Sequence, residues 1–214
     1  MQSALERASA FHFEWRMDLT VTGDRPSPGV SLQLQGDYQA PDRLRSSVST
    51  NAAGMSIQME SIAIGTKTWA KNFMTGEWSV VDGGMQPDPF KFGSIPLQIG
   101  NPFDIDLAEL DMSLIGTESV DGVDVWQYTG ERSPNSLPGD FRYDVYVGAA
   151  DALPRRIALE WEVTLAEVAA QANAFFAGQG MMPPTPTNGV AKWRVEMKYS
   201  RYGEPIEIVP PPGF

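Results

Sequence analysis

The 214-residue sequence contains no cysteine and only one histidine, His12. The lack of cysteine excludes disulfides, thiolate metal ligands and cysteine nucleophiles. A zinc site needs three or four ligands, and a hydrolytic triad needs a base beside its nucleophile. His12 stands in a strand pattern whose apolar residues point to the opposite face, so we expect it to be exposed to solvent. The sequence therefore predicts neither a metal site nor a histidine-dependent catalytic centre.

Signatures of nucleotide and nucleic-acid binding are also missing. The chain has no G-x-x-x-x-G-K-[ST] loop and no G-x-G-x-x-G turn, so we expect no cofactor. Twenty-seven acidic and sixteen basic side chains give a formal net charge of −11, and no Lys/Arg-rich run interrupts the chain. Phosphate binding needs a basic footprint, so we expect no nucleic acid partner and interpret the acidity as a solubility feature.

Long apolar runs are absent too. No stretch reaches the roughly 18 apolar residues of a membrane-spanning helix. Met1-Gln2-Ser3 shows neither the basic nor the apolar region of a signal peptide. We expect either a cytoplasmic protein or a mature domain whose export signal was removed.

The acidic residues do not form a recognisable catalytic arrangement. Asp104, Asp106, Glu109 and Asp111 lie where acids stabilise the start of a helix, and we do not interpret them as a carboxylate pair for acid–base or glycosidase chemistry. Asp121-Gly122-Val123-Asp124 is too sparse for a calcium loop and is typical of a hairpin turn. We therefore predict that the protein is not an enzyme.

Apolar and polar residues alternate along much of the chain, which is typical of half-buried strands. The longest such run extends from Phe11 to Val21. Turn formers separate it from similar runs at 30–34, 44–50, 55–64, 123–128, 141–147, 156–163 and 191–199. The pattern predicts an α+β fold that is mainly antiparallel β, with a large meandering sheet.

Three segments favour helices. They are 107–114, with Leu107, Leu110 and Leu114 at helical spacing; 164–177, which opens with the capping box Thr164-Leu165-Ala166-Glu167; and residues 3–9. Two Pro/Gly-rich stretches, 82–96 and 178–189, are interpreted as long loops because the strand pattern resumes after each. We therefore expect one domain spanning 1–214.

Bulky, adaptable apolar side chains are abundant: ten Met, six Trp and ten Phe. Methionine lines promiscuous binding surfaces because its thioether chain is flexible and polarizable. Several of these residues share strand phases, which favours either an ordinary core or a sheet face that binds an apolar ligand. Candidate ligand-contacting residues are Trp15, Met17, Met55, Ile57, Met59, Trp69, Leu107, Leu110, Phe175, Phe176, Val195 and Met197.

The 164–177 helix has Glu167 as its only charge and carries Phe175 and Phe176 towards a Gly/Met/Pro-rich segment. A surface helix usually shows more charge on its outer face. The pattern is consistent with a lid over a cavity, a membrane-touching edge, a partner surface or a helix packed on the sheet.

Seven segments, in this order, resemble the LolA/LppX-like carriers of lipid and lipoprotein in the bacterial periplasm, especially the LppX/LprG type. They cover nearly the whole chain: 9–15, 36–45, 64–70 followed by 76–78, 120–130, 153–157 and 199–208. Two features depart from the family pattern. Tyr146-Val147-Gly148 replaces its "WvD", and 164–189 has the character of an inserted helix and loop.

The resemblance implies a curved half-barrel sheet of about eight to eleven strands, with two or three helices covering its concave face. It also implies an extracytoplasmic binder or carrier of lipid, acyl chain or another apolar ligand, with a membrane or a lipoprotein as possible further partner. An N-terminal lipid anchor on an upstream cysteine is implied as well. The alternative is a protein-interaction or envelope-sensor module with the same fold and a filled core.

Overall fold

The computed structural model describes residues 8–24, 27–52, 55–81, 111–131, 139–167 and 188–214, and these contain eleven strands. The strands are β1 (Ala10–Gly23), β2 (Ser27–Gln39), β3 (Arg43–Ala52), β4 (Met55–Ile64), β5 (Lys67–Lys71), β6 (Trp78–Val80), β7 (Ser113–Val120), β8 (Val123–Gly130), β9 (Asp140–Gly148), β10 (Pro154–Thr164) and β11 (Gly189–Ser200).

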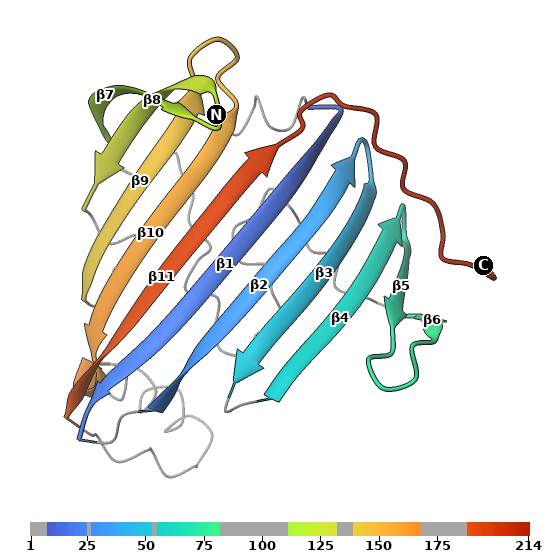
Figure 1. Cartoon of the computed structure of the whole chain (residues 1–214), viewed down its shortest axis with the longest axis horizontal. Helices are drawn as coiled ribbons and strands as arrows, with labels where there is room; N and C mark the ends of the chain where they lie inside the picture. The colour runs from blue at the N-terminus through green and yellow to red at the C-terminus, as the bar shows by residue number, and fades with distance from the viewer. Residues whose placement is uncertain (1–7, 25–26, 53–54, 82–110, 132–138, 168–187) are drawn as a thin grey trace.

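All eleven strands belong to one antiparallel sheet with the order β6-β5-β4-β3-β2-β1-β11-β10-β9-β8-β7 (Figure 1). Strands β1 to β6 meander outwards from the centre in one direction, and β7 to β11 meander back towards it from the other edge. The first and last strands meet in the middle, where they pair from His12 with Ser200 to Gly23 with Gly189. This pairing joins the two meanders into one sheet.

Short turns connect several pairs of neighbouring strands, among them β2–β3, β4–β5 and β7–β8, as the turn formers predicted. Between β7 and β8, Asp121 and Gly122 have φ values of 50° and 79°. Positive φ at both central residues is typical of a type I′ turn, whose twist matches that of the flanking strands. Val120 and Val123 close this two-residue hairpin. The interpretation of Asp121-Gly122 as a hairpin turn is therefore confirmed.

The sheet is open and uncurled, with β6 and β7 at opposite edges (Figure 1). The predicted strong half-barrel curvature is not present in the described strands. Bulges are the features that bend a sheet sharply. The register shifts lie close to strand ends, at Leu19/Val21, Pro154/Arg156 and Leu114/Gly116. In the middle of the sheet the described strands pair without a bulge, so the sheet has only the ordinary twist of paired strands.

Helix is scarce among the described residues, where it amounts to one turn at 165–167. The predicted capping box is present. Thr164 Oγ1 accepts a hydrogen bond from the backbone N–H of Glu167 at 3.2 Å, and Glu167 Oε2 accepts one from the backbone N–H of Thr164 at 3.0 Å. The rest of that predicted helix, 168–177, lies outside the described residues.

The other two helix predictions fail where they can be checked. Leu114 belongs to strand β7, where it faces Tyr128. Residues 8 and 9 are not helical, and the Ser9 carbonyl accepts the amide of Ala40 at 2.8 Å. In both places sheet pairing satisfies the backbone, and this overrides local helix propensity. Residues 3–7 and 107–110 lie outside the described residues.

The main core lies on one face of the sheet and draws on β1, β2, β3, β4, β9, β10 and β11. Each large apolar side chain that is fully buried contributes about 1.5–3 kcal/mol. A smaller cluster lies on the opposite face, where Ile62 and Trp69 pack against Ile208. The C-terminal segment is held there because Arg43 donates to the Ile208 carbonyl at 2.8 Å and the Ile208 amide donates to Gln39 at 3.2 Å.

Candidate functional site

The main core is organised as rows of side chains that cross the strands. Residues that face each other in an antiparallel pair point to the same side of the sheet. One row crosses nine strands without a polar residue other than the Tyr128 hydroxyl and the Trp15 indole. It consists of Met59, Val48, Leu34, Trp15, Met197, Ile157, Val145, Tyr128 and Leu114. We call the side of the sheet that carries this row the apolar face.

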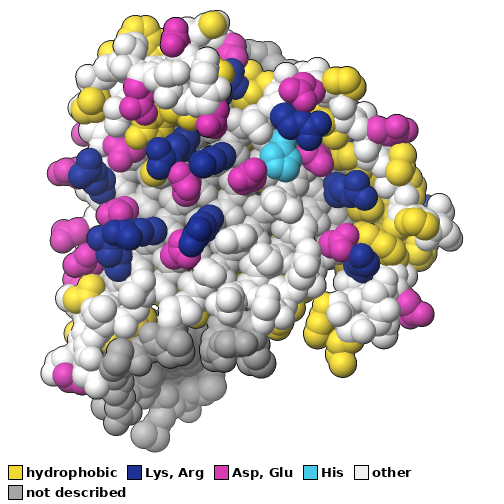
Figure 2. Space-filling model, in the orientation of Figure 1, with side chains coloured by type: hydrophobic (Ala, Val, Ile, Leu, Met, Phe, Trp, Pro, Cys, Tyr) yellow, Lys and Arg dark blue, Asp and Glu magenta, His cyan; other side chains and the backbone are white. Residues whose placement is uncertain are grey.

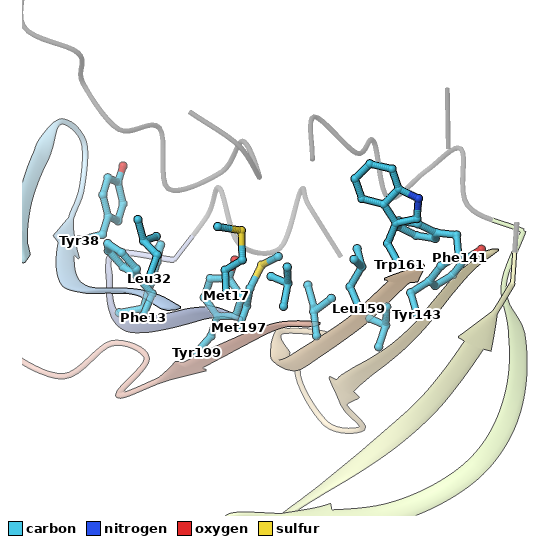
Figure 3. Packing of buried hydrophobic residues seen from close by; sticks show 14 of the residues in the cluster. Phe13, Met17, Leu32, Tyr38, Phe141, Tyr143, Leu159, Trp161, Met197 and Tyr199 are labelled. Atoms are coloured by element: carbon cyan, nitrogen blue, oxygen red, sulfur yellow. The ribbon is translucent and has the colours of Figure 1, made fainter. Parts of the chain in front are cut away.

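A second row runs beside the first. It consists of Ile57, Thr50, Leu32, Met17, Val195, Leu159 and Tyr143. Figure 3 shows Met17, Leu32, Leu159 and Tyr143 of this row projecting to the same side of the sheet as Met197 of the first. Next along β10 and β11, Trp161 and Trp193 stack with their ring centroids 4.4 Å apart. The apolar face is therefore continuous in both directions.

Burial changes along the nine-strand row. Met197, Ile157 and Val145, on β11, β10 and β9, are buried. The two ends are open to solvent, since Met59 is 48% and Leu114 is 54% exposed. Trp15 and its neighbour Leu34 are partly buried. The apolar face is thus closed over β9–β11 and becomes accessible towards both edges.

Two polar groups on this face bear on what it can bind. The Nε1 of Trp15 is buried and has no hydrogen-bond partner among the described residues. Buried donors normally have a partner, so a carbonyl or hydroxyl oxygen of a ligand would satisfy this group. Burial raises the pKa of Tyr199, so its hydroxyl stays protonated and neutral. Neither group therefore places a fixed charge on the apolar face.

The structure brings six of the predicted contact residues together on the apolar face: Trp15, Met17, Ile57, Met59, Val195 and Met197. Met55 begins β4, but its side chain lies outside the described residues, as do Leu107, Leu110, Phe175 and Phe176.

Trp69 lies on the opposite side of the sheet from the other predicted residues. It faces Ile62 across the β4–β5 pair and packs with Ile208. The prediction grouped it by side-chain type, whereas its side of the sheet is set by the register of the short Ile64–Lys67 turn. Sequence reasoning also missed the large contribution of β9 and β10, which comes from Tyr143, Val145, Ile157, Leu159 and Trp161. The alternation of apolar and polar residues in these strands was visible in the sequence. Their position in the sheet, with β10 beside β11 and β9 beside β10, was not.

The other side of the sheet, which we call the polar face, carries cross-strand ion pairs (Figure 2). Arg156 pairs with Glu196 at 2.7 Å, and Glu160 pairs with Arg194 at 3.0 Å and Lys192 at 3.3 Å. Burial acts to raise the pKa of Glu160, but the hydrogen bonds and charges of Lys192 and Arg194 outweigh it and hold that pKa below its ordinary value. These charges are therefore largely satisfied within the protein.

His12 lies on the polar face, as predicted, but it is not fully exposed. Its Nδ1 lies 2.8 Å from Asp37 Oδ1, because His12 and Asp37 are paired across β1 and β2. Glu14 is 3.6 Å from its other ring nitrogen. Among the described residues, no group of three or more His, Asp or Glu side chains is placed to hold a metal ion.

A shallow hollow with a volume of about 410 Å³ lies over β1 to β4 and β11. Gln33, Gln35, Ser47, Ser49 and Gln58 contribute polar, uncharged groups to it. Gln35 and Ser47 also line a smaller hollow beside it, which reaches His12 and Asp37. Both hollows belong to the polar face and neither offers an apolar enclosure.

Among the described residues, none of the helical structure has the length and hydropathy that a membrane-spanning helix requires.

No family model and no curated protein matches the sequence. Solved structures are similar over almost the whole chain. LprF from Mycobacterium bovis is 12% identical with a TM-score of 0.54, over 99% of this chain and 93% of that one. The lipoprotein LppX from Mycobacterium tuberculosis is 12% identical with a TM-score of 0.46, over 97% and 93%.

A LolA-superfamily protein from Nitrosomonas europaea is 11% identical, with a TM-score of 0.28 over 98% of this chain and 94% of that one. At these identities the likeness concerns the fold, and LprF carries it most clearly. The fold of this chain is therefore similar to that of LprF.

Proposed function

We propose that this chain is a non-catalytic, extracytoplasmic binding or carrier protein that holds a lipid, an acyl chain or another apolar ligand against its apolar face. The observation that carries the proposal is the nine-strand row from Met59 to Leu114, which is buried in one part and accessible towards both edges. Met59 and Leu114 are half exposed at the two ends of this row, so an apolar ligand that lies along the row would cover them.

The chemistry of this row suits a flexible hydrocarbon. Burial of an acyl chain contributes about 0.8 kcal/mol per methylene, which supplies useful affinity without directional bonds. Met17, Met59 and Met197 can adapt to ligands of different shape. The free Trp15 N–H would then orient one oxygen atom of the ligand, such as an ester carbonyl.

The fold supports the location and the role. The resemblance to the LolA/LppX-like carriers implies an export route, a place in the cell envelope and a lipid anchor on a cysteine upstream of this chain. Within this proposal the ligand cavity lies over the apolar face, and 164–189 is an insertion in the sequence. Strands β10 and β11, which flank this segment in the sequence, are paired in the sheet, and Thr164 faces Val190.

The test is the uptake of a fluorescent fatty acid, together with native mass spectrometry of the protein purified from a lysate that contains membranes. We expect co-purified lipid and saturable uptake. The double variant Leu34→Gln/Met59→Gln should weaken uptake at least about tenfold, because it places amides on the accessible part of the apolar face. Both side chains are incompletely buried, so the variant should still fold.

The matched control is Gln33→Ala/Gln58→Ala, which changes the polar face of the same two strands and should leave uptake unchanged. If the protein carried no lipid and took up no fatty acid, the carrier function would be wrong. The apolar face would then be the filled core of an interaction or sensor module, which is the alternative that the sequence left open.

A further inference from the structure

The hairpin that joins β5 to β6 exposes two large apolar side chains side by side. Phe73 is 61% exposed and Met74 is 80% exposed, the largest exposed fractions among the large apolar side chains of the described residues. We call these two residues the apolar tip. They lie at one edge of the sheet, where the hairpin projects beyond the neighbouring strand β4 (Figure 1). Surface apolar residues are common singly, but an adjacent pair on a projecting turn needs a reason.

The backbone of this hairpin is hydrogen-bonded internally. Asn72 Oδ1 accepts the amides of Met74 at 2.8 Å and Thr75 at 3.1 Å. The backbone carbonyl of Asn72 accepts a hydrogen bond from the N–H of Gly76 at 2.8 Å, and the N–H of Asn72 donates to the backbone carbonyl of Glu77 at 2.8 Å. The N–H of Glu77 donates to Thr75 Oγ1 at 3.3 Å. The tip is therefore held in one shape, and moving it out of water would leave few backbone donors unsatisfied.

Amphipathic groups stand directly behind the apolar tip. The Lys71 ammonium lies 5.9 Å from the ring centroid of Trp78 and 2.7 Å from Glu60 Oε1. Trp78 is partly buried on the last pair of the sheet, opposite Lys71. Tryptophan and lysine are the residues that prefer the boundary between water and hydrocarbon. The apolar tip is thus followed first by Trp78 and Lys71, which suit a membrane interface, and then by the charged Glu60.

The shape of this edge does not fit a protein partner. Phe73 and Met74, together with Val80 and Val81, which are 50% and 38% exposed at the same edge, form a small apolar surface. A stable interface needs roughly 800 Å² from each protein, which is more than four partly exposed side chains supply. Strand β6 contains only three residues, Trp78–Val80, which is too short to template an added strand. A bilayer needs no complementary surface, since it accepts any small apolar projection.

We infer that the 72–77 hairpin is a membrane-contact element whose apolar tip inserts into the interfacial layer of a zwitterionic phospholipid bilayer. The lipid should be zwitterionic because the chain has a net charge of −11 and the lysine behind the tip is already paired with Glu60. This site goes beyond the proposed carrier function and does not depend on it, because the tip lies on a connection outside both rows of the apolar face.

The first experiment is flotation with phosphatidylcholine vesicles. We expect the protein to float, and the variant Phe73→Ser/Met74→Ser to lose at least about tenfold in partition coefficient. The matched control is Ile115→Ser/Val123→Ser, which removes exposed apolar side chains from the opposite edge of the sheet and should float like the unchanged protein. Adding an anionic lipid should weaken flotation.

A second experiment locates the contact directly. Because the chain has no cysteine, Met74→Cys provides a single attachment site for an environment-sensitive fluorophore. Its emission should shift to the blue when phosphatidylcholine vesicles are added, whereas the same label at Thr117→Cys on β7 should not respond.

The inference is wrong if the unchanged protein does not float, if the tip variant floats equally well, or if the label at position 74 does not respond. It is also wrong if the tip variant abolishes self-association in the absence of vesicles, since the tip would then be a protein contact. Fatty-acid uptake in solution separates this site from the carrier function. The tip variant should retain uptake, and Leu34→Gln/Met59→Gln should lose uptake but still float.

Discussion

The two faces of this sheet are made by the same strands, yet they differ in almost every property. In β1, Met17 is buried on the apolar face, while its neighbour Arg16 is exposed on the polar face and pairs with Asp18 at 2.8 Å. The backbone pairing is common to both. The difference follows from alternation alone, which sends adjacent side chains to opposite sides. The comparison teaches that the two faces can be altered separately.

The charged side chains of the polar face are largely paired with one another. Over β1, β11 and β10 its charges alternate in sign and pair across the strands, and over β2 to β4 it is mostly uncharged (Figure 2). Ion pairs at such exposure contribute little to stability, but they keep this side of the sheet hydrated. The apolar face carries continuous rows of apolar side chains instead. Ligand binding is therefore expected from the apolar face and not from the polar one.

The largest expected effect comes from placing a charge at the centre of the apolar face. Val195 is buried between Met17 and Leu159, so Val195→Asp should lower the free energy of unfolding by about 4 kcal/mol, because the carboxylate would be buried without a partner. The adjacent change Glu196→Ala, on the polar face, should cost less than about 1 kcal/mol. Urea unfolding followed by tryptophan fluorescence measures both. Equal losses would show that the two faces are not energetically distinct.

An intermediate effect tests how tightly the apolar face is packed. A Cβ added at Gly36 would lie 2.3 Å from the Arg45 carbonyl oxygen and 2.6 Å from the Phe13 ring. Because a backbone carbonyl cannot move aside, Gly36→Ala should destabilise the protein by about 2 kcal/mol. Gly116→Ala on the edge strand β7 is the control, since its Cβ would have nothing within 4 Å. Its unfolding free energy should change by less than about 0.5 kcal/mol. A harmless Gly36→Ala would mean that this part of the face is loosely packed.

Alternation predicted most of the sheet, since the central strands carry one buried and one hydrated side. It did not predict β5, β6 or β7. The first two contain five and three residues, too few for a period to be visible. Strand β7 is exposed on both sides along most of its length, so no side is marked by apolar residues. The meeting of β1 with β11 depends on pairing between distant segments, which local patterns do not encode.

The candidate site was predicted in part for the same reason. Trp15, Met17 and Met197 were grouped correctly because they share the phase of long strands. Trp69, which was predicted as a further contact residue, lies on the opposite side of the sheet from these three. It belongs to a short strand after a tight turn, where a shift of the pairing by one residue moves a side chain to the other side. The apolar residues of β9 and β10 were missed as part of the site, because only the strand order shows that they extend the same rows.

The smallest expected effect is on the polar face, at Glu160. Its pKa is held below the ordinary value by Lys192 and Arg194 against the opposing effect of burial. A carboxylate with a lowered pKa stabilises the fold above its unfolded pKa, and this contribution is lost as the pH falls through the folded pKa. In Lys192→Gln/Arg194→Gln the pKa should therefore rise, because burial remains while both cations are removed.

Carboxyl NMR titration measures this change, and Arg16→Gln is the matched control because it removes a cation that pairs with Asp18 instead. Unfolding at neutral pH should change by less than about 0.5 kcal/mol, since the pairs are exposed and screened by water. A rise in the Glu160 pKa without loss of structure would show that polar-face charges can be removed at little cost. If the double variant unfolded, the ion pairs would be essential, and the contrast between a structural apolar face and a solvating polar face would not hold.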